Sequence, residues 1–371
     1  MTTEEALPGA ADAAAKARAA ALVGQVISGR YRIVELVAMG GMGAVYRGEH
    51  LRMRKRIAIK VLHPDIEGLP DLVARFEREA VAGAHLSHPN AAAATDFGEL
   101  EDGSTFLVLE YVAGRTLRAV IDEEGPLPPE RAARIARQLA TVLGAAHAAG
   151  IVHRDVKPRN VMLVEGTEDF VKLIDFGLAK VAADRLSTEA SDDRARRAMG
   201  PLTGQGMLLG TVAYLAPEAA LGMDGVDASS DLYALGLILY ELLAGKRPFD
   251  AKTPGAMFRA HRFEPPPPIA ARSPAARVPV ELEAVAMRLL EKDKRRRYAT
   301  GEEVAQALDA AMAADASPKP VSVRPSAHPA PPAKGARSRT PFVAAACVVA
   351  FVGAAAATLR VSSGPRASVT P

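Results

Sequence analysis

The sequence has very little cysteine and few aromatic side chains. Cys347 is the single cysteine among 371 residues, tryptophan is absent, and aromatic residues make up 5% of the chain. One cysteine excludes an internal disulfide framework and a Cys-x-x-Cys metal site, and it favours a reducing compartment for the folded part. The shortage of aromatic residues argues against a stacking surface for bases, so we expect no nucleic acid as a partner.

The chain as a whole also lacks an excess of one charge. Its 46 Lys and Arg residues nearly balance its 43 Asp and Glu residues, which leaves a formal net charge of +3. The distribution is uneven, because residues 313–371 contain seven basic residues and one acid, Asp315. The basic character therefore belongs to the tail and does not indicate a nucleic-acid-binding surface on the rest of the chain.

The sequence divides into an arm, a long patterned region and a tail. Residues 1–28 are rich in alanine, and acids stand where a secretory signal is basic, which excludes such a signal. The stretch 11–24 could be helical, but its apolar part is mostly alanine and could bury little, so we expect a disordered arm. From Tyr31 to Val112, four short apolar runs predict strands, with a helical stretch over 71–86 between the third and the fourth. After Gly125 the pattern becomes mainly helical. Strands followed by helices indicate an α+β protein with a small sheet-rich lobe and a larger helical lobe.

The tail predicts a linker and a membrane anchor. Residues 313–340 are rich in Pro, Ala, Ser and basic residues, and residues 342–359 are 18 uncharged residues. As a helix this run spans about 27 Å, close to the ~30 Å hydrocarbon core of a bilayer. The alternative is a buried Ala-rich helix. The basic linker residues would keep the folded part in the cytoplasm, which predicts a single-pass protein of the inner (cytoplasmic) membrane with residues 360–371 outside.

A glycine-rich turn is the first of several motifs that carry chemistry. The run AMGGMGAVY, residues 38–46, separates two predicted strands, and such a turn lets backbone N–H groups approach phosphate oxygens. Alone it is more often only a turn. Lys60 ends the next strand. Glu79 falls on the apolar stripe of the helical stretch 71–86, where a carboxylate needs a cation, and Lys60 is the natural partner.

Three further motifs follow in the helical half. In HRDVKPRN, residues 153–160, Asp155 can accept a proton from a hydroxyl, Lys157 can neutralise phosphate charge, and Asn160 can hold a metal ion. IDFG, residues 174–177, supplies Asp175 as a carboxylate ligand for Mg²⁺. APE, residues 216–218, comes after a long polar stretch. Phosphoryl transfer needs these parts together: a phosphate cradle, a cation, metal ligands and a group that orients the nucleophile.

The ordered set resembles the signature of protein kinases, and its wording resembles the bacterial, eukaryotic-like serine/threonine protein kinases. The resemblance covers residues 31–311, about three quarters of the chain. It implies a bilobal protein kinase fold, with a small β-rich N-lobe containing one main helix and a larger helical C-lobe. It also implies ATP and Mg²⁺ as cofactors, and serine or threonine residues of proteins as substrates.

The resemblance assigns a role to each matching residue. Lys60 would contact the phosphates and pair with Glu79, and Asp155 would be the catalytic base with Lys157 beside it. Asn160 and Asp175 would hold Mg²⁺. Backbone groups of Glu110 and Val112 would receive adenine. Asp231 would steady the catalytic loop, and Arg297 would pair with Glu218. The loop covering the phosphates would comprise Val37, Ala38, Met39, Gly40, Gly41, Met42, Gly43, Ala44 and Val45.

The resemblance also predicts regulation in the segment before APE. Arg154 would bind a phosphate on this segment, for which Thr203 is the expected autophosphorylation site, while Thr211 would belong to the substrate groove. One departure is Ala38, which stands where the family has the first glycine of the loop. A second Asp-Phe-Gly, at residues 96–98, precedes the hinge strand, so we interpret Asp96 as a turn residue rather than a metal ligand.

Two alternatives remain at this stage. A pseudokinase scaffold keeps the fold without catalysis, but such proteins usually lack the lysine, the base or a metal ligand, and all of these are present. A kinase for small molecules is disfavoured by the long segment before APE. Residues 360–371 are too few to form a sensor domain. We therefore expect signals to reach the protein through the linker, a partner protein, or homodimer formation in the membrane.

Overall fold

The computed structural model describes residues 8–40, 43–62, 86–176, 212–221 and 225–316. The chain separates into two units, Met1–Lys319 and Pro320–Pro371, and every described residue lies in the first. That unit contains the predicted sheet lobe and helical lobe, so the expected α+β organisation is confirmed for the described residues.

The sheet lobe is built on six antiparallel strands in the order β1-β2-β3-β4-β6-β5. Alternate residues face its core, where Ile33, Tyr46, Ile59 and Phe106 are almost completely buried. This alternation of apolar and polar residues is what the sequence runs predict for a sheet with one buried face. The strands are β1 (Val26–Ile27), β2 (Tyr31–Gly40), β3 (Gly43–His50), β4 (Lys55–Leu62), β5 (Ala94–Glu99) and β6 (Thr105–Glu110).

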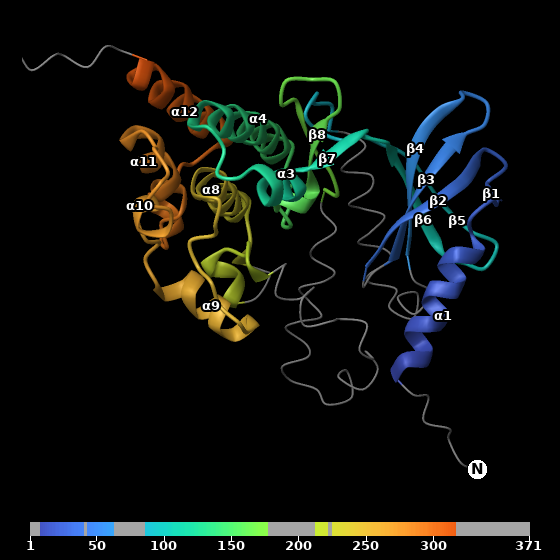
Figure 1. The fold of residues 1–371 in the computed structure, drawn as a ribbon. Coiled ribbons are helices and arrows are strands. Elements are labelled where there is room, and N and C mark those ends of the chain that lie inside the picture. The colour runs from blue at the N-terminus through green and yellow to red at the C-terminus, as the bar shows by residue number, and fades with distance from the viewer. Residues whose placement is uncertain (1–7, 41–42, 63–85, 177–211, 222–224, 317–371) are drawn as a thin grey trace, which may run out of the picture. The chain divides into compact units, whose positions relative to one another are not determined.

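The expected disordered arm is wrong for residues 8–27, because they form helix α1 (Pro8–Ala21) and strand β1. The helix lies beside the sheet (Figure 1). The hydroxyl of Tyr46 donates to the carbonyl of Ala19 at 3.1 Å, and Ala19 is 4% exposed. Arg18 donates to Asp102 and Ser104 in the β5–β6 turn. Alanine buries little area, but its small size lets the helix backbone approach Tyr46 closely.

The helical lobe contains a small sheet and a set of helices. Its three strands are β7 (Gly114–Thr116), β8 (Val161–Val164) and β9 (Val171–Leu173), in that order. The helices are α3 (Leu117–Glu124), α4 (Pro129–Ala148), α8 (Ala228–Ala244), α9 (Pro254–Phe263), α10 (Ile269–Arg272), α11 (Val280–Leu289) and α12 (Gly301–Ala316). Short 3₁₀ turns are η2 (Pro158–Asn160), η3 (Pro217–Leu221) and η5 (Lys294–Arg296).

Helix α8 is the centre of this lobe. Every residue from Ser230 to Ala244 is buried, as the apolar sequence of this stretch predicts, and α4 and α11 pack against it (Figure 1). Gly236 is needed for the close approach of α11, because a methyl group there would lie 2.6 Å from the Cβ of Leu289. The loop before β5 joins the two lobes, since Asn90 and Ala92 exchange backbone hydrogen bonds with Leu173 of β9.

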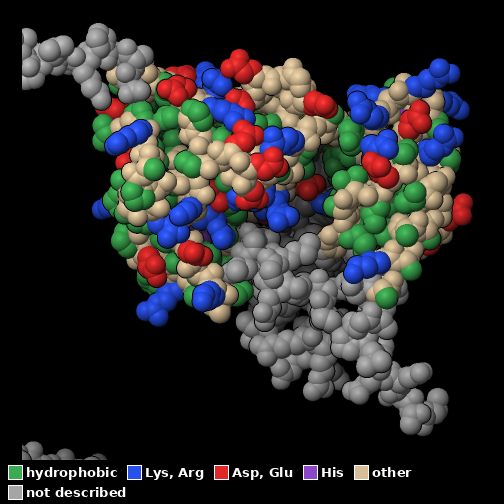
Figure 2. All heavy atoms as spheres, in the orientation of Figure 1, with side chains coloured by type: hydrophobic (Ala, Val, Ile, Leu, Met, Phe, Trp, Pro, Cys, Tyr) green, Lys and Arg blue, Asp and Glu red, His purple; other side chains and the backbone are tan. Residues whose placement is uncertain are grey.

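Charge is mixed on the face that Figure 2 shows. Lys and Arg side chains are spread over both lobes and alternate with Asp and Glu. This view agrees with the near balance of charge in the sequence, and it shows no large field of one sign on this face.

The end of α12 and the position of Asp96 differ from the expectations. Helix α12 continues to Ala316, so the first residues of the predicted linker 313–340 are helical. Asp96 is not in a turn but within strand β5, next to a register shift between Ala94 and Asp96, where it accepts a hydrogen bond from Tyr31 and pairs with Arg30. The predicted helix 71–86 lies almost entirely outside the described residues.

The predicted membrane helix 342–359 also lies outside the described residues. Among the helices that the structure does describe, none combines the length and the hydropathy needed to cross a bilayer.

Candidate active site

The buried carboxylate of Asp231, in the first turn of α8, fixes the loop that carries HRDVKPRN. Its Oδ2 accepts a hydrogen bond of 2.8 Å from the backbone N–H of His153, and its Oδ1 accepts one of 2.8 Å from the backbone N–H of Arg154. Nε2 of His147, on α4, also lies 2.8 Å from Oδ2. Arg154 adopts a φ of 64°, which a non-glycine residue keeps only when its surroundings hold it. The expected steadying of the loop by Asp231 is therefore confirmed.

Two polar side chains of this loop, Lys157 and Asn160, meet at Asp155. Lys157 donates to its Oδ2 at 2.7 Å, and the amide nitrogen of Asn160 donates to the same oxygen at 2.9 Å and to the backbone carbonyl of Asp155 at 2.8 Å. The Asp155 and Lys157 side chains are 20% and 17% exposed, so they face the solvent only partly. The residues that the sequence placed in one motif are thus also one hydrogen-bonded cluster.

His153 connects this loop to the segment around Asp175. Its side chain is buried, Nδ1 accepts from the N–H of Asp155 at 3.2 Å, and Nε2 lies 3.0 Å from the carbonyl of Ile174. These partners require a neutral ring with its proton on Nε2. The ring also lies 4.8 Å from that of Phe176. The predicted structural role of His153 agrees with these contacts.

Lys60 and Asp175 bring the two lobes together at the site. Nζ of Lys60, on β4, lies 3.4 Å from Oδ1 of Asp175, and their side chains are 13% and 25% exposed. Asp175 has a φ of 60°, a left-handed backbone conformation that non-glycine residues rarely adopt. Glu79, the expected partner of Lys60, lies outside the described residues.

The glycine-rich turn is a hairpin between β2 and β3. Ala38 pairs with Val45, Met39 with Ala44, and Gly40 with Gly43, while Gly41 and Met42 lie outside the described residues. Gly43 is required for close packing, because a Cβ there would lie 2.1 Å from the carbonyl oxygen of Val61 on β4. Val37 is 58% exposed.

The strand that precedes the connection between the lobes ends at Glu110. The N–H of Glu110 donates to the carbonyl of Ala93, and its carboxylate pairs with Lys172 of β9 at 2.9 Å. The Glu110 side chain is therefore engaged in an ion pair with the helical lobe. A cavity of about 410 Å³ also lies here, and its lining includes Tyr111 and Val112.

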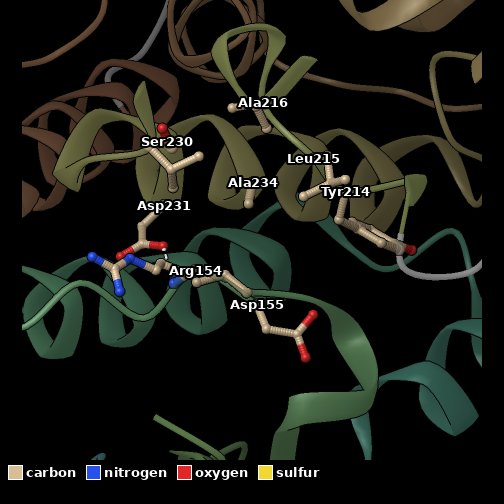
Figure 3. Close-up of a pocket in the computed structure, with 11 residues that line it drawn as sticks. Arg154, Asp155, Tyr214, Leu215, Ala216, Ser230, Asp231 and Ala234 are labelled. Atoms are coloured by element: carbon tan, nitrogen blue, oxygen red, sulfur yellow. Dashed lines mark hydrogen bonds between the residues drawn. The ribbon is translucent and has the colours of Figure 1, made fainter. Parts of the chain in front are cut away.

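A small pocket of about 20 Å³ lies beside Asp155 (Figure 3). Figure 3 shows Asp231 against Arg154 at one end and Tyr214, from the segment before APE, at the other. Tyr214 donates to Glu241 of α8, and Arg118 of α3 donates to the other oxygen of that carboxylate at 2.7 Å. Burial and the Glu241 charge raise the pKa of Tyr214.

The sequence motifs did not predict this ion pair of Arg118 and Glu241. The signal was Glu241, the single acid in the apolar run LYALGLILYELLAG that follows Asp231, since a buried carboxylate requires a cation. By contrast, the pairing of Glu218 with Arg297 is confirmed, with two bonds of 2.8 and 2.9 Å. Burial raises the pKa of Glu218, but the Arg297 charge and the Ser230 hydroxyl outweigh it and leave the pKa below its usual value.

Thr203 and Thr211 lie outside the described residues. Among the described residues, no group of three or more His, Cys, Asp and Glu side chains could hold a metal ion.

Comparison with known proteins gives a consistent result. Residues 31–309 match the protein kinase domain family. The chain is 41% identical to serine/threonine-protein kinase pkn3 of Myxococcus xanthus over 283 residues, 76% of this chain and 49% of that protein. It is 37% identical to PknB of Mycobacterium leprae over 281 residues, 75% of this chain and 42% of that protein. It thus spans about half the length of these relatives, or less.

A solved structure is also similar. The kinase domain of Mycobacterium tuberculosis PknI matches with a TM-score of 0.58 and 28% identity, over 78% of this chain and 98% of that domain.

Proposed function

The chain belongs to the protein kinase family, and we propose that it is an active kinase that transfers the γ-phosphoryl group of ATP to serine and threonine hydroxyls of proteins. The family generally uses ATP and Mg²⁺. The observation that carries the proposal is the cluster at Asp155, with Lys157 and Asn160 bound to it and with Lys60 and Asp175 in contact with each other. A pseudokinase scaffold usually lacks part of this set.

Asp155 is the proposed catalytic base. Its Oδ2 is bound by Lys157 and Asn160, while no hydrogen bond from a described residue reaches Oδ1. Oδ1 is therefore the oxygen that would accept the proton of a substrate hydroxyl. Lys157, which donates to Oδ2 of Asp155, would balance negative charge on the transferred phosphoryl group.

Asn160 and Asp175 fit the proposed Mg²⁺ site. The amide nitrogen of Asn160 is bound to Asp155, so its carbonyl oxygen is the atom left for a cation. Asp175 adds a partly exposed carboxylate, and both are the hard oxygen ligands that Mg²⁺ prefers. The ion would neutralise charge on the phosphates of ATP.

Lys60, with the backbone of residues 37–45, would bind those phosphates, and backbone groups of Glu110 and Val112 would bind adenine.

The two Asp-Phe-Gly sequences provide a matched test. Phosphorylation of a generic basic protein with radiolabelled ATP is measured for the full chain and for Asp155→Asn, Lys60→Met, Asp175→Asn and Asp96→Asn. We expect kcat to fall about 100-fold or more in the first three, on the scale of general-base and electrostatic contributions. Asp96→Asn should stay active. An Asp155→Asn protein with near wild-type phosphorylation would overturn the mechanism, and an inactive wild-type chain would favour the scaffold.

We also propose that phosphorylation of Thr203 orders the segment before APE through charge-assisted bonds to Arg154, with Thr211 in the substrate groove. The backbone of Arg154 is already held in place by Asp231. Mass spectrometry of the active protein should find Thr203 modified. Full activity of Thr203→Ala would count against this role.

Finally, we propose that residues 342–359 anchor the chain in the cytoplasmic membrane, with the catalytic part in the cytoplasm. Support comes from the 18 uncharged residues and from Lys334, Arg337 and Arg339 before them. Fractionation of cells that express the full chain or a 1–340 truncation tests the anchor, and a soluble full chain would refute it. Cross-linking in the membrane then tests for a homodimer.

A further inference from the structure

Lys292, in the loop between α11 and η5, reaches the end of helix α9. Its Nζ donates to the carbonyl of His261 at 2.7 Å, with the carbonyl of Ala260 at 3.4 Å and the hydroxyl of Tyr233 at 3.3 Å. No carboxylate of a described residue lies within ion-pair distance of this nitrogen. The cation is thus held by the last carbonyls of a helix, where the helix dipole favours positive charge.

Aromatic rings complete the surroundings of Lys292. Its Nζ lies 4.5 Å from the ring centroid of Phe249 and 5.6 Å from that of Tyr233, distances at which the face of a ring attracts a cation. Burial and the nearby Arg297 lower its pKa to about 8, against the opposing charge of Glu264, so the amine is still mostly protonated at pH 7. The contacts of Lys292 tie α9 to α8 and to the loop that carries Phe249.

Helix α9 also packs against the segment before APE. Met257 and Ala260 pack with Phe249 against Val212 and Ala213, and all five are buried. The position of α9 therefore sets the position of the backbone at 212–213.

The same segment forms the wall of the pocket beside Asp155. Tyr214, Leu215 and Ala216 line this pocket together with Asp155 (Figure 3). A displacement of α9 would thus move the surface that faces a protein substrate, while it would leave Lys60 and the glycine-rich hairpin in place, because these belong to the sheet lobe.

We propose that Lys292 is a positioning residue for protein substrates: by holding the end of α9 it fixes the segment 212–216 at the distance from Asp155 that a substrate chain requires. This inference rests on the proposed kinase function. It assigns Lys292 no contact with substrate or ATP.

A neighbouring lysine supplies the control. Lys294 lies two residues away and pairs with Asp227 at 2.7 Å, with both side chains 47% exposed. In the full-length protein we expect Lys292→Met to raise KM for a protein substrate about 3- to 10-fold, with kcat changed less than about twofold and KM for ATP unchanged. Lys294→Met should match the wild type in all three. Lys292→Gln, a milder change that keeps a hydrogen-bond donor, should raise KM in the same direction.

Hydrogen exchange supplies a readout that does not depend on activity. In Lys292→Met, amides of α9 and of residues 212–216 should exchange faster, while those of α4 should not change. Unchanged exchange at 212–216, an unchanged KM for the protein substrate, or an equal rise in KM for ATP would overturn the inference. If the wild type phosphorylates no protein, the proposed function fails instead, and the exchange comparison still tests the coupling of α9 to the segment.

Discussion

The guanidinium of Arg297 forms two parallel hydrogen bonds with the carboxylate of Glu218, although 79 residues separate them in the sequence. The Arg297 side chain is 0% exposed and that of Glu218 is 13% exposed. Ser230 donates to the same carboxylate, and Nε of Arg297 donates to the carbonyl of Glu291. This pair joins the end of the APE segment to α8 and to the loop after α11.

Removal of one partner should leave a buried charge without compensation. We expect Arg297→Met to lower the free energy of unfolding by roughly 3–5 kcal/mol, the range found when a buried pair is broken. Glu218→Gln combined with Arg297→Met should cost less than the two single changes added together, because neither charge is then buried alone. Urea unfolding of the four proteins measures both effects. A loss below about 1 kcal/mol in Arg297→Met would show that water or another cation replaces the guanidinium.

Much of the site could be predicted because its members are close in the sequence. Asp155, Lys157 and Asn160 lie within six residues, so their mutual contacts depend on local loop geometry. The pairing of Glu218 with Arg297 and the role of Asp231 are long-range, and only the resemblance to a family indicated them. Local patterns give no information on which distant residues meet.

Other features could not be predicted for physical reasons. Helix α1 is held by a backbone carbonyl at Ala19 and by Arg18, contacts that an alanine-rich composition does not reveal. The local sequence at Asp96 predicts a turn, since aspartate and glycine favour turns, but tertiary contacts with Tyr31 and Arg30 keep Asp96 in a strand. At Asp96, tertiary contacts therefore overrode local preference, whereas at α1 they stabilise a helix that an alanine-rich sequence already favours.

His261 should make stability depend on pH. Burial, with the charges of Lys292 and Arg247, lowers its pKa to about 3, against an opposing effect from the backbone of Ala213. In the unfolded chain the His261 imidazole takes up a proton near pH 6.5, but in the folded protein it does not. The contribution of His261 to the free energy of unfolding is therefore complete above pH 6.5 and is lost as the pH falls towards 3.

The measurement is urea unfolding at pH 7, 6 and 5 for the wild type and for His261→Gln. Between pH 7 and 5 the wild type should lose about 1–2 kcal/mol more than the variant does. Parallel pH curves for the two proteins would show that the imidazole takes up its proton as readily in the folded protein as in the unfolded chain.

The contact of α1 with the sheet lobe can be tested with adjacent alanines. Ala19 is buried against Tyr46 and Ala20 is exposed. Ala19→Asp should place a charge in an apolar contact and lower the melting temperature by several degrees, corresponding to about 1–3 kcal/mol. Ala20→Asp has the same charge and nearly the same place in the helix, so it controls for helix propensity. Equal melting temperatures for the two variants would show that α1 contributes no packing to the lobe.

Ala38 is the point at which the glycine-rich hairpin departs from the family. Its side chain is exposed on β2, it pairs with Val45, and a register shift lies between Leu36 and Ala38. Its φ is not in the left-handed region, so the methyl group fits the strand without strain. The methyl does, however, limit how closely this backbone can approach a phosphate, which is the reason that glycine is used at such positions.

We therefore expect Ala38→Gly to lower KM for ATP by about two- to fivefold, which corresponds to about 0.4–1 kcal/mol, while KM for the protein substrate stays the same. Steady-state kinetics with each substrate varied in turn distinguishes the two constants. An unchanged or raised KM for ATP in Ala38→Gly would show that the hairpin already accommodates the Ala38 methyl group when nucleotide binds.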